Sequence, residues 1–312
     1  MSMQTAIVSE PTVDSLHFKE IALSDREWME PLLRASDYRS EEYSFTFAYV
    51  WRGVFAYKAA RYRDMLIIKS ERETHPPSYL FPAGSGDIGA VIEALIHDAR
   101  ANGHGLLFHT ILPEQIQVLE TLYPGRFHIT PIRDYWDYLY DAQSLITLAG
   151  KKLHAKRNHI NRFKENNPDW TYEPITHDNL PEVLAMTDQW LEGHEVKSKT
   201  LMQESRAVCA AIRDFDALGL DGGAIRTGGR IVAFSMGDRL SSDTYHIQIE
   251  KAFGDVQGAY AIINQQFAAH NCADYRYINR EDDSGQEGLR KAKESYRPVM
   301  MVEKHIAKLL DA

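Results

Sequence analysis

The sequence has 312 residues, of which 44% are hydrophobic and 25% are charged, and its formal net charge is −9. This composition is ordinary for a globular protein, and the length suffices for two domains with separate cores. The acidic balance excludes a protein that binds nucleic acid or anionic lipid over its whole surface, so any such binding needs a local basic patch.

The cysteines and the N-terminus indicate the compartment. Cys209 and Cys272 have no partner at metal-ligand spacing, and two cysteines exclude a disulfide framework. Residues 1–13 lack the cationic flank and apolar centre of a signal peptide, and no run approaches the ~18 apolar residues that span a bilayer. We expect a cytoplasmic protein with a disordered tail over 1–14, no transmembrane segment and no metal site.

The first half predicts an α/β unit over 15–142. Ser24 caps a short helix whose apolar stripe includes Trp28 and Leu32. The remaining pattern predicts, in order, strands near 55–62 and 65–69, a helix over 87–102, a strand over 106–110, a helix over 113–123, and a closing strand near 135–140.

An aromatic segment over 37–51 interrupts this unit. Ordinary core is the favoured interpretation, and the alternative is a ligand pocket, because aromatic rings with polar tips suit a pocket wall. The candidate wall residues are Tyr38, Tyr43, Phe45 and Trp51.

A basic helix is expected over 144–166, between the two halves. Leu145, Ala149, Leu153, Ile160 and Phe163 fall on one stripe that would pack on the second domain. The rest of its surface is cationic in an acidic protein, which indicates an anion-binding patch, although a solvated helix face is the alternative. Its candidate ligand-binding residues are Lys151, Lys152, Lys156, Arg157, Asn158 and Arg162.

The second half, over 143–312, repeats the order of the first with one additional strand. Its pattern predicts helices over 180–191 and 202–215, strands over 220–226, 230–239 and 243–250, a helix over 258–270, a strand over 275–279, a helix over 286–296 and a strand over 299–303. This order indicates two copies of one α/β unit with mixed sheets.

Polar residues gather where the strand over 275–279 passes into the next helix. Asp282, Asp283 or Ser284 can cap that helix, and Pro298 limits its end. Polar groups at such a junction are a common site geometry in α/β sheets. A purely structural role as caps and turn residues is the alternative.

These residues also carry a resemblance. Residues 279–298 read Asn-Arg-Glu-Asp-Asp-x-Gly-x-x-Gly-Leu-Arg-x-x-Lys-x-Ser-Tyr-x-Pro, and 150–163 read Gly-Lys-Lys-Leu-His-x-Lys-Arg-Asn-His-Ile-Asn-x-Phe. Both motifs resemble bacterial proteins with a domain like the C-terminal domain of phosphatidylglycerol lysyltransferase, over about Phe18 to Ile306. The resemblance implies two tandem acyl-CoA N-acyltransferase-like (GNAT-like) domains and points towards aminoacyl transfer from aminoacyl-tRNA.

Aminoacyl transfer would need a proton acceptor and a donor for the developing oxyanion. Glu281 or Asp282 could be the base, with Asn279 in the same cluster, and Arg280, Lys291 or Tyr296 could be the donor. A structural Glu281–Arg290 ion pair is the alternative. A tRNA partner would need cations for its phosphates, and the additional candidates are Gly288, Arg290, Lys291 and Lys293.

The loop before the helix over 258–270 argues against CoA as the acyl donor. Acyltransferases of this fold hold pyrophosphate on backbone amides at a helix start. Here Asp255 would repel a phosphate, Tyr260 stands where a small residue is wanted, and Gly258 is better explained as a helix-start glycine. An acyl-CoA N-acyltransferase with a degenerate loop and a non-catalytic RNA- or anion-binding module remain the alternatives. The sequence leaves the acceptor and the oligomeric state open.

Overall fold

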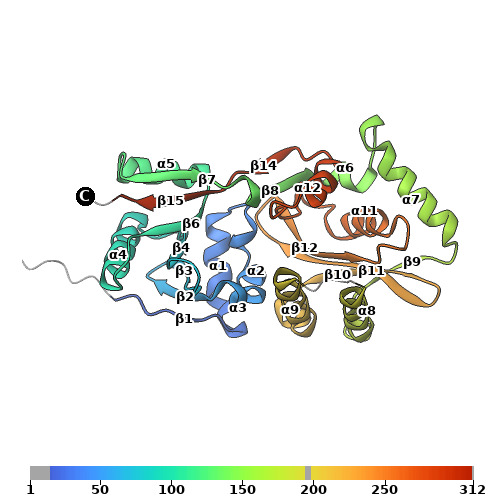
Figure 1. The fold of residues 1–312 in the computed structure, drawn as a ribbon, viewed down its shortest axis with the longest axis horizontal. Coiled ribbons are helices and arrows are strands. Elements are labelled where there is room, and N and C mark those ends of the chain that lie inside the picture. The colour runs from blue at the N-terminus through green and yellow to red at the C-terminus, as the bar shows by residue number, and fades with distance from the viewer. Residues whose placement is uncertain (1–14, 194–197, 311–312) are drawn as a thin grey trace, which may run out of the picture.

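The computed structural model describes residues 15–193 and 198–310, which form two lobes side by side (Figure 1). The expected tail over 1–14 lies outside the described residues. Each lobe is built on one mixed β-sheet with helices packed against it. None of the described helices is long and apolar enough to cross a membrane.

The first sheet has eight strands, with the order β1-β2-β3-β4-β6-β15-β7 and β5 beside β3. Its strands are β1 (Lys19–Glu20), β2 (Tyr57–Tyr62), β3 (Met65–Ser70), β4 (Ser78–Leu80), β5 (Ala83–Gly84), β6 (Leu107–Ile111), β7 (Phe127–Pro131) and β15 (His305–Leu309). Its core contains residues of α4 (Ile88–Ala101) and α5 (Pro113–Leu122). The side chain of Asp87 accepts a hydrogen bond from the amide of Ala90 and caps α4.

The second sheet has seven strands in the order β14-β8-β13-β12-β11-β10-β9. These are β8 (Asp137–Asp141), β9 (Thr171–Pro174), β10 (Asp221–Thr227), β11 (Arg230–Arg239), β12 (Thr244–Ala252), β13 (Tyr277–Asn279) and β14 (Met300–Val302). The surrounding helices are α6 (Ala142–Thr147), α7 (His154–Asn166), α8 (Leu180–Glu192), α9 (Lys199–Arg213), α10 (Phe215–Leu218), α11 (Ala259–Asn271) and α12 (Glu287–Glu294).

The two lobes exchange strands. The closing strand expected near 135–140 corresponds to β8, which pairs with β13 and β14 in the second sheet. Conversely, β15 near the C-terminus pairs with β6 and β7 in the first sheet. The predicted division after residue 142 therefore does not separate the sheets, because strand periodicity in the sequence does not specify a distant pairing partner.

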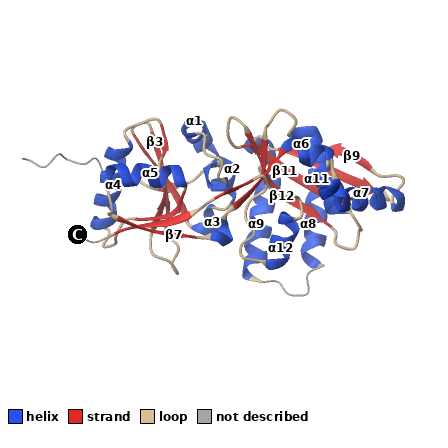
Figure 2. Ribbon diagram, turned by 90° about the horizontal axis from the view of Figure 1, so that it is seen from above, coloured by secondary structure: helices blue, strands red, loops and turns tan. Residues whose placement is uncertain are grey.

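A shared apolar core joins the lobes. Helices α1 (Arg26–Ser36), α2 (Phe45–Val50) and α3 (Arg52–Phe55) lie between the two sheets (Figure 2). Met29 and Phe45 from this layer belong to the same buried cluster as Val208 of α9 and Phe234 of β11. The lobes are thus held by a continuous hydrophobic interface, which favours a fixed relative orientation.

The aromatic segment packs as core. Tyr43 and Phe45 are buried, and Tyr38 and Trp51 are half-buried against the same cluster. Tyr43 and Phe45 also border a cavity of about 20 Å³, which has room for one water molecule. The core interpretation fits these rings better than the ligand-wall alternative.

The expected single helix over 144–166 is wrong. It is broken into α6, a short turn over Lys151–Leu153 and α7. Leu148 has a φ of 49° and Gly150 a φ of 84°, and such left-handed residues end a helix. Ala149 is exposed in this break, whereas Leu145, Leu153, Ile160 and Phe163 are buried as expected.

Candidate functional site

The candidate site begins where β13 leaves β12. The two parallel strands pair only over Thr244–His246 and Tyr277–Asn279, while β12 continues to Ala252. The segment after β13 becomes a polar turn in which Glu281 has a φ of 59°. A non-glycine residue in this left-handed conformation is strained and is often found at functional sites.

Several hydrogen bonds hold this turn in place. The side chain of Asn279 accepts a bond of 2.7 Å from the amide of Glu281 and donates one of 2.9 Å to Asp137. The buried ammonium of Lys293 donates to the main-chain carbonyls of Arg280, at 2.5 Å, and Asp282. These contacts hold the backbone of the turn in one conformation and fix the direction of the Arg280 and Glu281 side chains.

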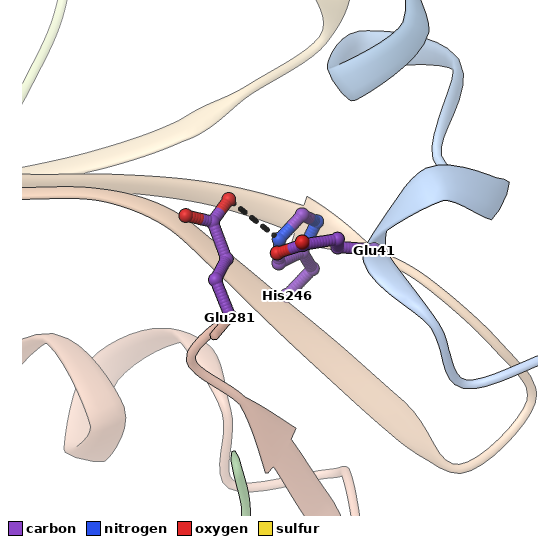
Figure 3. A group of neighbouring side chains, drawn as sticks. All are labelled: Glu41, His246 and Glu281. Atoms are coloured by element: carbon purple, nitrogen blue, oxygen red, sulfur yellow. Dashed lines mark hydrogen bonds and ion pairs between the residues drawn. The ribbon is translucent and has the colours of Figure 1, made fainter. Parts of the chain in front are cut away.

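Glu281 faces a buried histidine from β12. Its carboxylate lies 3.1 Å from Nε2 of His246, and Glu41 approaches the same imidazole (Figure 3). His246 is fully buried, while 26% of the Glu281 side chain is exposed. Glu281 is therefore the solvent-accessible end of a group that reaches into the interior.

Lys304, which immediately precedes β15, anchors this acidic group. Its fully buried ammonium lies 3.0 Å from Glu41, 2.9 Å from Glu42 and 2.6 Å from Asp137. Burial alone would lower the pKa of Lys304, but the three carboxylates raise it well above its ordinary value. Burial raises the pKa of Asp137 to about 6.

The same group has the donor types of a metal site. Glu41, His246 and Glu281 each offer one ligand atom, and these atoms lie within 4.8 Å of one another. In the structure, however, Glu41 already bonds to the Lys304 ammonium and His246 to Glu281. These contacts already engage Glu41 and Glu281 with protein partners, so the geometry is read most simply as a network of ion pairs and hydrogen bonds.

The other side of the turn is cationic and aromatic. Arg280 donates to Glu250 at 2.8 Å, and its guanidinium lies 4.7 Å from the ring centre of Tyr296. The ammonium of Lys156, from α7, lies 3.8 Å from the same ring centre. Burial raises the pKa of Tyr296 to about 12, so its hydroxyl keeps its proton at neutral pH. Its hydroxyl has no acceptor among the described residues.

The remaining predicted cations of α12 are engaged elsewhere. Arg290 bonds Asp283 at 2.8 Å and Asp134 at 2.7 Å, so the alternative Glu281–Arg290 ion pair is wrong. Lys291 is exposed and paired with Glu287. The buried ammonium of Lys293 is used inside the turn, so of these cations it alone touches the site.

The expected cap of α12 needs correction. The residue at its N-cap is Gln286, with no side-chain cap, because Asp283 bonds Arg290 instead of the helix start. Nothing lies within 4 Å of a Cβ placed at Gly288, so close packing against a neighbouring backbone in the described structure does not explain that glycine, and its place in ligand binding stays a prediction.

The basic stretch before and within α7 divides into two classes. Lys151, Lys152 and Arg162 are exposed, and exposed Asn158 bonds His154 on the same helix. Arg157 instead donates to the carbonyls of Leu148 and Gly150, at 2.8 Å for Gly150. The Arg157 guanidinium satisfies carbonyls at the break after α6, and its head group is therefore committed to structure.

We expect Arg157→Ala to lower the free energy of unfolding by about 1–3 kcal/mol, because two carbonyls lose a charged donor. Lys152→Ala, on the same stretch but exposed, should change it by less than ~0.5 kcal/mol. Urea unfolding of both variants measures this. Equal stabilities would show that the Arg157 contacts are not needed to hold the α6–α7 joint.

The start of α11, where this fold would hold a CoA pyrophosphate, is covered. A Cβ at Gly258, whose φ is 85°, would lie 2.3 Å from the carbonyl oxygen of His159 in α7. The amide of Ala259 bonds the carbonyl of Val256, and those of Ala261 and Ile262 bond the carbonyl of Gly258. Close packing requires the glycine here, and these amides are not free for a phosphate.

The motifs and fold can now be compared with known proteins. Residues 34–308 match the family model described as phosphatidylglycerol lysyltransferase, C-terminal. The chain belongs to this family. A crystal structure of a protein of unknown function from Bacteroides thetaiotaomicron has 40% identity and a TM-score of 0.91, covering 95% of this chain and all of that one.

More distant similarities are found in a second solved structure and in one sequence. The structure of L-PGS from Bacillus licheniformis has 17% identity and a TM-score of 0.64, with 92% of this chain and 93% of that chain covered. An uncharacterised protein from Mycoplasmoides gallisepticum is 24% identical over 184 residues, and the match spans 56% of either sequence. The architecture is the expected mixed α/β fold with two mixed sheets, shared with these family structures.

The family motifs contain only part of the site. Glu41 and Glu42 lie in the aromatic segment, His246 in a buried strand and Lys304 between two strands. The two adjacent acids within an apolar segment were a usable signal, because unpaired carboxylates are rarely buried. Nothing in the sequence around His246 or Lys304 distinguishes them from exposed strand residues.

Proposed function

We propose that this protein transfers an aminoacyl group from aminoacyl-tRNA to an amine or hydroxyl acceptor. The observation that carries the proposal is the arrangement around one strained turn: a partly exposed carboxylate, Glu281, on one side and unpaired donors around Tyr296 on the other. Ester aminolysis or transesterification needs these two functions and little else.

In the proposed reaction, Glu281 takes a proton from the attacking nitrogen or oxygen of the acceptor. A bond forms between that atom and the ester carbonyl carbon, and the bond from this carbon to the ribose oxygen breaks. The ribose oxygen leaves as a hydroxyl group by taking the proton that Glu281 removed from the acceptor, which returns Glu281 to its carboxylate form. Asp282, the other candidate base, is the less favoured one because its carboxylate accepts hydrogen bonds from the amide and hydroxyl of Ser284.

The hydroxyl of Tyr296 is the proposed donor to the developing oxyanion. It is protonated at neutral pH, and it has no acceptor within the described part of the chain. A donor that meets an acceptor only during the reaction stabilises the transition state more than the ground state. Lys291, an alternative donor, is exposed and paired with Glu287, which disfavours it.

A tRNA donor fits better than a CoA thioester. The covered start of α11 lacks the free amides for a pyrophosphate, whereas Lys151, Lys152 and Arg162 present exposed cations towards solvent. Exposed cations can bind the phosphates of a nucleic-acid backbone without contacting its bases. Such a donor also agrees with a cytoplasmic location.

The test uses total tRNA charged with labelled amino acids, mixed with the protein and with fractionated lipid, peptide and small-molecule acceptors. The proposal predicts that label moves from tRNA to one fraction and that labelled acetyl-CoA donates nothing. Acetyl transfer from CoA would favour the acyl-CoA alternative. Salt-sensitive tRNA binding without any transfer would instead favour a non-catalytic binding module.

A further inference from the structure

Lys156 lies near Arg280 and Glu250 but forms no ion pair or hydrogen bond with any residue in 15–193 or 198–310. Its ammonium rests on the ring of Tyr296. Burial, and after it the nearby Arg280 guanidinium, lower the pKa of Lys156 to about 8, although the Glu250 carboxylate, which bonds Arg280, acts in the opposite direction. The lowered pKa shows that Glu250 does not fully offset the other two effects, so a further anion beside the half-buried ammonium would stabilise its charged form.

Arg280 also has unused binding capacity. Its Nη2 bonds Glu250, but its buried Nη1 has no acceptor in the described structure. A buried donor without a partner costs free energy comparable to a lost hydrogen bond. The guanidinium lies against the rings of Tyr140 and Tyr296, at 5.5 and 4.7 Å from their centres, which holds its plane in place.

We propose that Lys156 and Arg280 form a subsite for a phosphate group, with the Tyr296 ring between α7 and the turn as its apolar wall. The two side chains come from separate elements, α7 and the turn after β13, and both contact this ring. A tetrahedral anion accepts from an ammonium and a guanidinium at once and supplies the missing acceptors.

The subsite rests on the proposed function and deepens it. Arg280 directly precedes Glu281, so the phosphate would bind beside the reacting group. In an aminoacyl-tRNA, the 5′-phosphate of the terminal adenosine and the aminoacyl ester are on one ribose, and a phosphate held here would position the ester at the turn. The exposed cations of the Lys151–Leu153 turn and α7 would then serve more distant phosphates.

The experiment compares puromycin, an aminoacyl-adenosine analogue without a phosphate, with puromycin 5′-phosphate. For the native protein, we expect the phosphate to strengthen binding by about tenfold or more, as charge-assisted hydrogen bonds do. Lys156→Met and Lys156→Gln should lose this gain and keep the affinity for unphosphorylated puromycin. Calorimetry at fixed ionic strength measures both affinities.

Lys164→Met is the matched control, because Lys164 also lies on α7 with its ammonium over a ring, 5.1 Å from the centre of Trp170. It should retain the full gain. An unchanged gain in both Lys156 variants, or no gain in the native protein, would overturn the subsite. If neither puromycin binds, the proposed donor fails. Inorganic pyrophosphate then tests the subsite alone: binding lost in Lys156→Met supports it, and no binding refutes it.

Discussion

Replacing Lys304 by methionine is expected to destabilise the protein by about 3–5 kcal/mol at pH 7.5, because three buried carboxylates lose their common cation. The ammonium of Lys304 touches Glu41, Glu42 and Asp137, and all four groups are buried. These residues belong to the short 3-10 helix Glu41–Tyr43 before α2, to β8 and to the segment before β15, so removing the shared cation should loosen the contact between the lobes. Chemical unfolding measures the change.

The loss of unfolding free energy in Lys304→Met should become smaller as the pH falls towards 5. In the native protein, burial already raises the pKa of Asp137 from 3.8 to about 6. A carboxyl group with a raised folded-state pKa binds its proton more tightly when folded, so lower pH favours the folded form. Removing Lys304 should raise the pKa of Asp137 further, so lowering the pH should stabilise the variant more than the native protein. Lys308→Met, at an exposed position of β15, is the control; similar stability for both variants would contradict the role of Lys304.

The second large effect is expected from Glu281→Gln, which should reduce aminoacyl transfer by about 10²–10⁴-fold, the range of a lost general base. The glutamine amide oxygen can still accept a hydrogen bond from His246. Glutamine should adopt the backbone φ of 59° as readily as glutamate does. Unfolding free energy and tRNA affinity should therefore stay close to those of the native protein. Single-turnover transfer separates the chemical step from binding.

Glu287→Gln provides the comparison for this variant, because Glu287 is exposed and pairs with Lys291. It should transfer at the native rate. Near-native transfer by Glu281→Gln would remove Glu281 from the mechanism. An equal loss in both variants would indicate a general effect of lost negative charge near α12.

The sequence predicts elements with strong local patterns. The helix over 87–102 corresponds to α4, with Val91, Ile92 and Leu95 buried, and the strand over 230–239 corresponds to β11. Short strands such as β1, β4 and β5 escape prediction because two or three residues carry no period. The break after α6 was missed because Leu148 has no intrinsic preference for a left-handed conformation.

The candidate site, too, is only partly predictable from the sequence. The turn over 279–282 is recognisable from its polar residues and motif, but its surroundings depend on distant pairing. The exchange of β8 and β15 brings Asp137 and Lys304 next to Glu41, and no local pattern encodes that exchange. Side chains in basic runs look equivalent in the sequence, yet Arg157 bonds backbone carbonyls and Lys156 lies on a ring.

The most direct measurement of the central claim is the binding of fluorescent total tRNA, charged and uncharged, across a salt series with acetyl-CoA as competitor. We predict salt-dependent binding that prefers charged tRNA and is insensitive to acetyl-CoA. Displacement of tRNA by acetyl-CoA, or binding of acetyl-CoA with no affinity for tRNA, would contradict an aminoacyl-tRNA-dependent transferase.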